Sequence, residues 1–420
     1  MQDNEKKPAL RFKGFTDPWE QRKLAELTKT ITTGKSVNSD EGEVSDGDIG
    51  VLKTSCVSYD RFNSSESKPV VKSEQQLVKC AVEKDSVIVS RMNTPERVGA
   101  CGYVSTDFPN LFLPDRLWKL KFQDTVDTYF VYMMLVSSAY KEKITSMASG
   151  TSGSMYNIPK ETFLNLQLVI PAKIDEQKQL GKILKKIDTL ITLHQRKYEK
   201  LVNIKKSMLD KMFPKNGASV PEIRFKGFTD LWEQRKLEEY LEVSGQKNFE
   251  GIYTKEDVLS VSGDFGIVNQ IEFQGRSFAG ASVANYGVVE TGDIVYTKSP
   301  LKSNPYGIIK ANKGKNGIVS TLYAVYKPKQ SANPEFVQIY FEQDARMNNY
   351  MHPLVNKGAK NDMKVSAENA LKGQIVFPDI KEQRTISEFF RNLDTLITLH
   401  QRKLEKLQNI KKSCLEKMFV

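Results

Sequence analysis

The side chains best suited to binding chemistry gather in a few polar loops, and most of them are cations or amides. In the first half of the chain, SRMNTPERVG holds Arg91, Asn93 and Arg97, and SGTSGSMYN holds Ser152 and Tyr156. In the second half, TKSPLKSNPYG and NKGAKNDMK hold the remaining candidates, which are Lys298, Lys302, Tyr306, Lys357, Lys360 and Asn361. Arginine, lysine and asparagine can hydrogen-bond purine edges or phosphate oxygens. The loops therefore predict contact with nucleic acid, although for any single residue phosphate contact or plain solvent exposure is more common than base reading.

Enzymatic and metal chemistry finds little support in the motifs. SNPYG at 303–307 comes near the Asn/Asp-Pro-Pro-aromatic loop with which DNA methyltransferases hold a flipped base, but it has one proline, and no Gly-rich turn for a methyl donor follows a strand. GKNG and GTSGS do not fit the phosphate-binding loop, which needs Gly, four residues, then Gly-Lys-Ser/Thr. The four cysteines form no CxxC pair and there are only three histidines, so neither a disulfide framework nor a zinc site is predicted.

The overall charge favours a partner that is a polyanion. The chain has 62 basic and 51 acidic residues, a formal charge of +11 and a sequence pI near 9.1. Such a balance promotes phosphate contact with release of counterions, and it also serves solubility. No stretch approaches the roughly 18 apolar residues of a membrane span, and the polar start MQDNEKKPALRFKGF lacks the apolar core of a signal peptide. We therefore expect a cytoplasmic protein with no membrane partner.

The chain repeats itself at two places. Residues 8–24 (PALRFKGFTDPWEQRKL) return at 221–237 (PEIRFKGFTDLWEQRKL), an offset of 213. Residues 186–214 return at 392–420 with an offset of 206, and only four of the 26 positions from Asp188 to Phe213 change. Units of this length differ from the short periods of solenoids, and the segments between them share no visible alignment. The sequence therefore predicts two equivalent scaffolds that carry two different domains.

Each of the longer repeated segments has the spacing of a coiled-coil helix, with seam residues at alternating steps of three and four. The predicted pairing positions are Ile187, Ile191, His194 and Leu201 in the first segment and Leu393, Ile397, His400 and Leu407 in the second. We expect the two histidines to fix the register of the seam, because no Cys, Asp or Glu cluster of metal-binding spacing accompanies them. Apolar residues off the seam, such as Leu190 and Leu193, leave a face for a second helical partner.

The segment ahead of each helix predicts a mixed α/β domain that positions the polar loops. Strands are predicted at 86–90, 117–122 and 166–171 in the first half, and at 266–273, 292–298, 317–327 and 373–378 in the second. Core helices are predicted over 126–144 and 335–351. We therefore expect an α+β fold with domains at 1–172 and 215–379 and long helices at 173–214 and 380–420.

On these residues the chain resembles the specificity subunit of type I restriction–modification systems. The likeness lies in FKGFTDPWEQRKL and FKGFTDLWEQRKL, in the two ITLHQRK helices, and in SGTSGSMYNIPKETFLNLQLVIPAKIDEQ with its weaker echo GAKNDMKVSAENALKGQIVFPDIKEQ. GDIVYTK and DSVIVSR also resemble strands that precede base-contacting loops in that family. The motifs run along almost the whole chain and are highly specific together, but MKVS stands in place of YNIP in the echo, which departs from the pattern.

The resemblance implies two mixed α/β target-recognition domains separated by two long antiparallel coiled-coil helices with pseudo-two-fold symmetry. Each domain would read half of a bipartite site on double-stranded DNA. The helices would dock two methyltransferase subunits, and restriction–translocase subunits would join the assembly. The resemblance also implies a non-catalytic chain without a cofactor, since S-adenosylmethionine, ATP and magnesium would be carried by the partner subunits.

Two other functions stay open from the residues alone. A non-catalytic coiled-coil scaffold would account for the helices, but about four-fifths of the chain lies outside them. A fused DNA adenine methyltransferase would need the two motifs that the sequence does not provide. Binding that weakens steeply with added salt, and that requires the correct two-part DNA sequence, would distinguish recognition from a scaffold.

Overall fold

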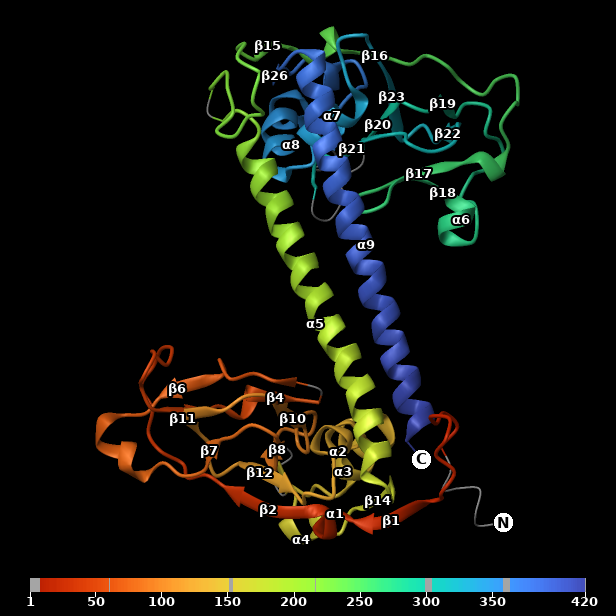
Figure 1. The fold of residues 1–420 in the computed structure, drawn as a ribbon. Coiled ribbons are helices and arrows are strands. Elements are labelled where there is room, and N and C mark those ends of the chain that lie inside the picture. The colour runs from red at the N-terminus through yellow and green to blue at the C-terminus, as the bar shows by residue number, and fades with distance from the viewer. Residues whose placement is uncertain are drawn as a thin grey trace. The chain divides into compact units, whose positions relative to one another are not determined.

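The chain folds into two compact units (Figure 1). The computed structural model describes residues 8–59, 61–150, 154–215, 217–298, 304–357 and 363–419. Unit 1 comprises Met1–Gln195 together with Arg402–Val420, and unit 2 comprises Arg196–Gln401. Each unit thus combines one α/β domain with parts of two long helices, α5 (Ile174–Lys211) and α9 (Ile380–Met418).

Unit 1 is built on two four-stranded sheets. Its strands are β1 (Trp19–Lys23), β2 (Thr28–Thr33), β3 (Gly50–Leu52), β4 (Val57–Ser58), β5 (Arg61–Phe62), β6 (Ser67–Pro69), β7 (Ala81–Val82), β8 (Ser86–Ser90), β9 (Met92–Asn93), β10 (Cys101–Val104), β11 (Phe108–Phe112), β12 (Leu117–Phe122), β13 (Tyr156–Asn157) and β14 (Gln167–Pro171). Its shorter helices are α1 (Leu24–Leu27), α2 (Thr128–Leu135), α3 (Ser138–Ser146) and α4 (Lys160–Leu164). The main sheet has the order β10-β8-β12-β2 and is antiparallel throughout, whereas the second, β6-β3-β11-β7, contains the parallel pair β3 and β11.

The strand β8 is central to unit 1, and both of its faces are covered by other elements. All five residues of its SVIVS segment are buried. Val87 and Val89 belong to the apolar cluster that includes α2, and Ile88 points into the cluster beneath the second sheet. Seven of the eight residues of α2 are buried as well. A run of β-branched residues forms a strand of this kind when it is enclosed on two sides.

Unit 2 repeats the main sheet and the helix pair. Its strands are β15 (Glu233–Lys236), β16 (Leu241–Val243), β17 (Leu259–Ser262), β18 (Gly266–Asn269), β19 (Gly287–Val289), β20 (Ile294–Thr297), β21 (Ile309–Ala311), β22 (Gly317–Val319), β23 (Tyr323–Pro328), β24 (Asn356–Lys357), β25 (Met363–Lys364) and β26 (Gln374–Phe377). Its shorter helices are α6 (Gln270–Gln274), α7 (Pro334–Tyr340) and α8 (Asp344–Met351). The antiparallel sheet β16-β23-β20-β21 packs against α7, and all four residues of β20 are buried.

The two predicted core helices are each split in two, so the sequence interpretation was wrong there. Residues 126–144 form α2 and α3, separated at Val136 and Ser137. The backbone N–H and the hydroxyl of Ser137 both donate to the carbonyl of Met134, at 3.0 and 2.7 Å, which ends α2 with a tight turn. Residues 335–351 split in the same way into α7 and α8. Helical periodicity continues across both breaks, which is why the pattern concealed them.

The strand predicted over 266–273 is also only half correct. Its first part is β18, but the second part is α6, because the Asn269 side chain accepts hydrogen bonds from the N–H groups of Ile271 and Glu272 and caps a helix. The segment 317–327 forms two strands, β22 and β23, instead of one. The strands predicted at 86–90, 117–122 and 166–171 correspond to β8, β12 and β14.

The long helices run antiparallel within each unit, which agrees with the expected fold class. In unit 2, the Lys205 ammonium lies 2.8 Å from a carboxylate oxygen of Asp394, and further along α5 the Phe213 ring lies 6.4 Å from that of Phe390. Residue numbers therefore rise along α5 as they fall along α9. In unit 1, Lys411 and Asp188, the residues at an offset of 206, form the equivalent ion pair at 2.8 Å.

Each long helix begins against its own domain and ends in the core of the other unit. The end of α5, with Met212 and Phe213, belongs to the core of unit 2. The end of α9, with Met418 and Phe419, belongs to the core of unit 1. Equivalent backbone hydrogen bonds of 2.9 Å fix these ends, from Ile223 to the carbonyl of Lys211 and from Leu10 to that of Lys417. Neither domain therefore supplies its whole core from one continuous segment.

Candidate nucleic-acid interface

The repeated RFKGF and EQ motifs hold the start of each long helix to the domain before it. Arg11 forms two hydrogen bonds to Glu176 at 2.6 and 2.8 Å, and Arg224 forms two to Glu382 at 2.8 Å each. Both carboxylates are buried. These side-chain hydrogen bonds raise the pKa of Arg11 and of Arg224 above the usual arginine value. A buried bidentate pair fixes direction as well as distance, so each helix leaves its domain at a defined angle.

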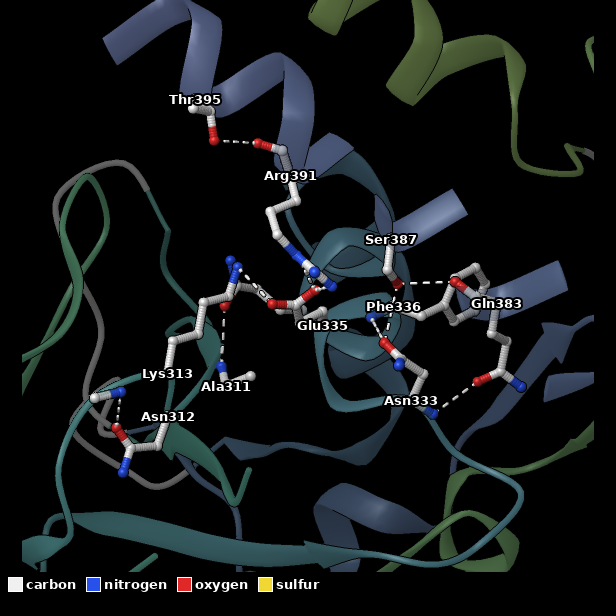
Figure 2. Close-up of polar contacts among 12 residues, drawn as sticks. Ala311, Asn312, Lys313, Asn333, Glu335, Phe336, Gln383, Ser387, Arg391 and Thr395 are labelled. Atoms are coloured by element: carbon white, nitrogen blue, oxygen red, sulfur yellow. Dashed lines mark hydrogen bonds and ion pairs between the residues drawn. The ribbon is translucent and has the colours of Figure 1, made fainter. Parts of the chain in front are cut away.

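The residue after each of these glutamates is a glutamine, Gln177 or Gln383, and it fixes the first turn of α2 or α7. In unit 2 the side chain of Gln383 accepts from the Asn333 N–H at 2.9 Å (Figure 2). It also donates to the carbonyl of Pro378 at 2.9 Å. Ser387 also donates to the Asn333 side chain, which caps α7 by accepting from the Phe336 N–H. In unit 1, Gln177 makes the equivalent contacts with α2 through the Asp127 N–H.

Unit 1 brings its two candidate loops together beside the end of β8. The strands β9 and β13 pair antiparallel, with Asn93 opposite Tyr156. Arg91 occupies the first position after β8, where its Nε donates to the carbonyl of Asp115 at 2.8 Å. Arg97 is exposed, whereas Tyr156 is half-buried against the core. Ser152, the other candidate in this loop, lies outside the described residues.

Asn93 supports the loop from within. It is only 7% exposed. Its side-chain amide donates to the hydroxyl of Ser90 at 3.0 Å, and its side-chain oxygen accepts from the Thr94 N–H at 2.9 Å. Both polar ends of the side chain are therefore occupied by the loop that carries Arg91 and Arg97.

Sequence reasoning missed a hollow that lies beside this loop. The hollow has a volume of about 720 Å³, and its lining includes Pro95 and Glu96 from the loop with Tyr59 and Lys141. The ammonium of Lys141 sits 3.7 Å from the centre of the Tyr59 ring. Lys141 is on α3, which the fold alone brings to the loop, so no local motif could have identified it.

In unit 2, Lys298 has the same place after β20 that Arg91 has after β8. Burial, together with the nearby charge of Lys247, lowers the pKa of Lys298 below the usual lysine value. Tyr306 is half-buried, and its carbonyl accepts a hydrogen bond from the Tyr296 hydroxyl at 2.8 Å. Lys302 lies outside the described residues.

The second candidate loop of unit 2 is bounded by a short strand pair. Lys357 lies in β24, which pairs antiparallel with β25. The backbone of Lys357 is described but its side chain is not, and Lys360 and Asn361 lie outside the described residues. The segment MKVS, which departs from YNIP, begins with β25 where YNIP begins with β13.

None of the predicted seam positions of the long helices is exposed. Ile187 and Leu393 are buried, at 9% and 6% exposure. The other predicted positions are half-buried, and they are Ile191, His194, Leu201, Ile397, His400 and Leu407. The alternating spacing thus coincides with reduced exposure along both helices.

Lysines complete the seam in both units. In unit 2, Lys205 contacts both Asp394, at 2.8 Å, and Glu342, at 2.9 Å. Burial opposes the charged form of Lys205, but the two carboxylates outweigh it and raise the pKa above the usual lysine value. In unit 1, Lys411 contacts Asp188. Charged seam residues of opposite sign favour one register of the helix pair over others.

Apolar side chains are also exposed on the helices, at repeated positions. Leu193 and Leu399, which differ by the offset of 206, are 45% and 43% exposed. Leu396 and Ile410 are similarly exposed. In the described ranges no group of three or more His, Cys, Asp or Glu residues is arranged to hold a metal ion. No helix in the part that the structure describes is both long and apolar enough to cross a membrane.

Comparison with known proteins gives a consistent picture. Residues 16–203 match the family model of the type I restriction modification DNA specificity domain. The type I restriction enzyme MjaX specificity subunit of Methanocaldococcus jannaschii is 21% identical over 412 residues, which cover 94% of this chain and 91% of that protein. The MjaVIII specificity subunit of the same organism is 22% identical over 298 residues, 68% of each chain. The crystal structure of the type I system S subunit from M. genitalium has a TM-score of 0.60 at 16% identity, with 98% of this chain and 99% of that chain covered.

Residues 16–203 are therefore similar to a domain that is named for DNA specificity in type I restriction–modification systems. Along most of its length the chain is similar to specificity subunits of type I restriction–modification systems. The sequence resemblance to this family is confirmed, and so is the α+β fold with two long paired helices.

Proposed function

We propose that this chain reads a bipartite site on double-stranded DNA, one half with each α/β domain, and that it carries no catalytic site. The main support is one framework that appears twice with different loops. Arg91 and Lys298 follow the equivalent strands β8 and β20, and the loop sequences around them are unrelated. Loops on a rigid scaffold carry specificity, and different side chains contact different base edges.

The proposed contacts come from the loops at the ends of β8 and β20. In unit 1 they involve Arg91, Arg97, Ser152 and Tyr156, with Asn93 holding the loop in shape. In unit 2 the proposed contacts are Lys298, Lys302, Tyr306, Lys357, Lys360 and Asn361. Arginine suits bidentate contact with guanine, whereas lysine suits phosphate, so unit 2 would depend more on backbone contacts than unit 1 does.

The long helices would set the distance between domains 1–172 and 215–379 and would dock two methyltransferase subunits. Exposed apolar side chains at repeated positions, such as Leu193 and Leu399, support two equivalent docking surfaces. Restriction–translocase subunits would join this cytoplasmic complex. S-adenosylmethionine, ATP and magnesium would act on the partner subunits, because the sequence of this chain provides no motif for them.

A domain exchange with a methylation readout tests the proposal. Residues 25–150 are replaced by those of a relative with another specificity, and the chain is expressed with its methyltransferase partner. Sequencing of methylated adenines should show that one half of the target changes while the other half and the spacer between them stay the same. The matched control replaces residues 238–357 and should change the other half only.

Two results would contradict the proposal. One is a change in both half-sites after a single exchange, which would mean that the domains do not read independently. The other is methyl transfer or DNA cleavage by the purified chain alone, which would place chemistry in a subunit for which we propose none.

A further inference from the structure

Unit 1 contains a basic hollow at the end of β8 opposite the candidate loops. The hollow has a volume of about 840 Å³ and lies between the strand ends of the main sheet and the first turns of α5. Its charged lining consists of Lys29, Lys84, Lys121, Lys178, Lys182, Lys185, Asp85, Asp124 and Asp127. Six lysines against three aspartates leave a surplus of three positive charges. Lys84 and Asp85 precede β8 whereas Arg91 follows it, so the hollow and the loops are separate surfaces.

Only some of these lysines are neutralised within unit 1. Lys121 contacts Glu83 at 2.5 Å, and Lys29 lies 3.9 Å from Asp124. No ion pair within the described residues involves Lys84, Lys178 or Lys182, and all three are exposed. A lysine on one rim would be an ordinary solvated charge, but three from two separate elements face one hollow.

The wall of the hollow is aromatic where α5 meets the core. The Lys185 ammonium lies 3.4 Å from the Tyr103 hydroxyl and 5.5 Å from the centre of the Tyr129 ring. The two rings pack edge to face with centres 4.9 Å apart. Tyr129 donates to Asp188, and Tyr103 donates to Asp85. Lys185 therefore faces aromatic rings, which attract a cation without cancelling its charge.

Unit 2 shows the same place in a neutralised form. Glu335 lies two residues after the N-cap residue Asn333 of α7, and Tyr129 lies two residues after the N-cap residue Asp127 of α2. Arg391 is the counterpart of Lys185 at the offset of 206. Glu335 contacts both Arg391 and Lys313 (Figure 2). One carboxylate thus serves two cations in unit 2, whereas unit 1 has a tyrosine in its place. The duplicated framework makes unit 2 an internal reference for the charge of unit 1.

We propose that the basic hollow of unit 1 is a second anion site, which binds phosphate groups through Lys84, Lys178 and Lys182. Lysine ammonium groups are compact point charges that suit phosphate oxygens, and the volume admits more than one phosphate. Two sources share this chemistry: the backbone of duplex DNA beyond the recognised bases, and a free nucleoside triphosphate. The site does not depend on which half-site the loops of unit 1 read.

The test uses the full-length chain with three probes: inorganic triphosphate, ATP, and a duplex that lacks the recognition site. The variant Lys178→Gln/Lys182→Gln removes two exposed charges and should leave the fold intact, which its thermal unfolding will show. The matched control is Lys403→Gln/Lys406→Gln, two exposed lysines of α9 that do not line the hollow. We expect K178Q/K182Q to weaken binding of at least one probe by about tenfold, with little change in the control.

The probes distinguish the two sources. Weaker duplex binding, with the slope of log affinity against log salt reduced by about two, assigns the site to the DNA backbone. Weaker binding of triphosphate and ATP alone assigns it to a free nucleotide. A Tyr129→Glu variant, which copies Glu335 of unit 2, should weaken the same probe as K178Q/K182Q does.

The proposal is overturned if all three probes bind K178Q/K182Q and the parent chain equally well. It is overturned too if that variant loses only a protein partner. Methylated half-sites should be the same in K178Q/K182Q as in the parent. Failure of the anion-site proposal would therefore leave the proposed reading of DNA by the loops unaffected. Failure of the proposed reading would likewise leave the anion-site proposal unaffected.

Discussion

Single residues in the candidate interface fall into those that face outward and those that hold the loops. Asn93 shows the difference, because its type suits adenine recognition while its contacts are internal. Both of its side-chain polar groups are satisfied by Ser90 and Thr94, and the residue is almost fully buried. A base could reach this amide only after the loop had opened. Residue type therefore made this loop a candidate but did not reveal which way the amide points.

We predict that Asn93→Ala lowers the stability of the chain by about 1–2 kcal/mol, because two hydrogen bonds are lost and Ser90 keeps a buried hydroxyl. The measurement is denaturant unfolding of the parent and the variant. Arg97→Ala, at an exposed position of the same loop, is the control and should change stability by less than about 0.5 kcal/mol. Equal effects of the two substitutions would mean that Asn93 does not hold the loop.

At the scale of elements, local patterns predicted the buried strands and the long helices well. SVIVS and LWKLKF are apolar runs of strand length, and they form β8 and β12. The helix breaks at Ser137 and Phe341 were not predicted, because apolar periodicity continues across them. Contacts between distant segments, such as Arg11 with Glu176, were also hidden. The repeat marked both motifs as important, but a one-dimensional pattern does not state which motif touches which.

The lysines of the helix seam allow a comparison between two equivalent contacts. Lys205 joins α5 both to α9, through Asp394, and to the domain of unit 2, through Glu342. Within the described residues, Lys411 pairs with Asp188 alone. Removing Lys205 leaves two half-buried carboxylates near each other without a cation. This destabilises the chain more than the single unpaired carboxylate that removal of Lys411 leaves.

We predict that Lys205→Ala destabilises the chain by about 1–3 kcal/mol and Lys411→Ala by about half as much, after allowance for partial solvent screening. Urea unfolding at two salt concentrations measures both. Because the pKa of Lys205 is raised in the folded state, its contribution is complete below the unfolded lysine pKa and is lost as the pH rises through the folded one. The difference between the parent and K205A should therefore shrink only at strongly alkaline pH. A greater effect of K411A would contradict this account.

At the scale of the whole molecule, the chain crosses between units, so distance in sequence misleads about stability. Phe419 follows the domain of unit 2 in the sequence, yet it packs against Phe130 in the core of unit 1, with ring centres 5.5 Å apart. Phe213 follows the domain of unit 1, yet it lies among the rings of unit 2, including Trp232 at 6.0 Å and Phe336 at 5.7 Å. Each helix end therefore completes a core that the rest of its own half does not contain.

We predict that Phe419→Ala loosens unit 1 and Phe213→Ala loosens unit 2, each by about 3–5 kcal/mol, the usual cost of removing a buried aromatic ring. Hydrogen exchange read by mass spectrometry locates the effect, since peptides from β8 and β12 should lose protection in F419A, and peptides from β20 and β23 in F213A. Leu231→Ala, at a side chain that is 70% exposed, is the control and should change neither set. If F419A loosened unit 2 in place of unit 1, the helix end would not be part of the core in which the structure places it. If F419A loosens unit 1 and F213A loosens unit 2, each half of the chain depends on the other for its fold. A domain exchange then keeps both α/β domains folded only when the repeated helices are left intact.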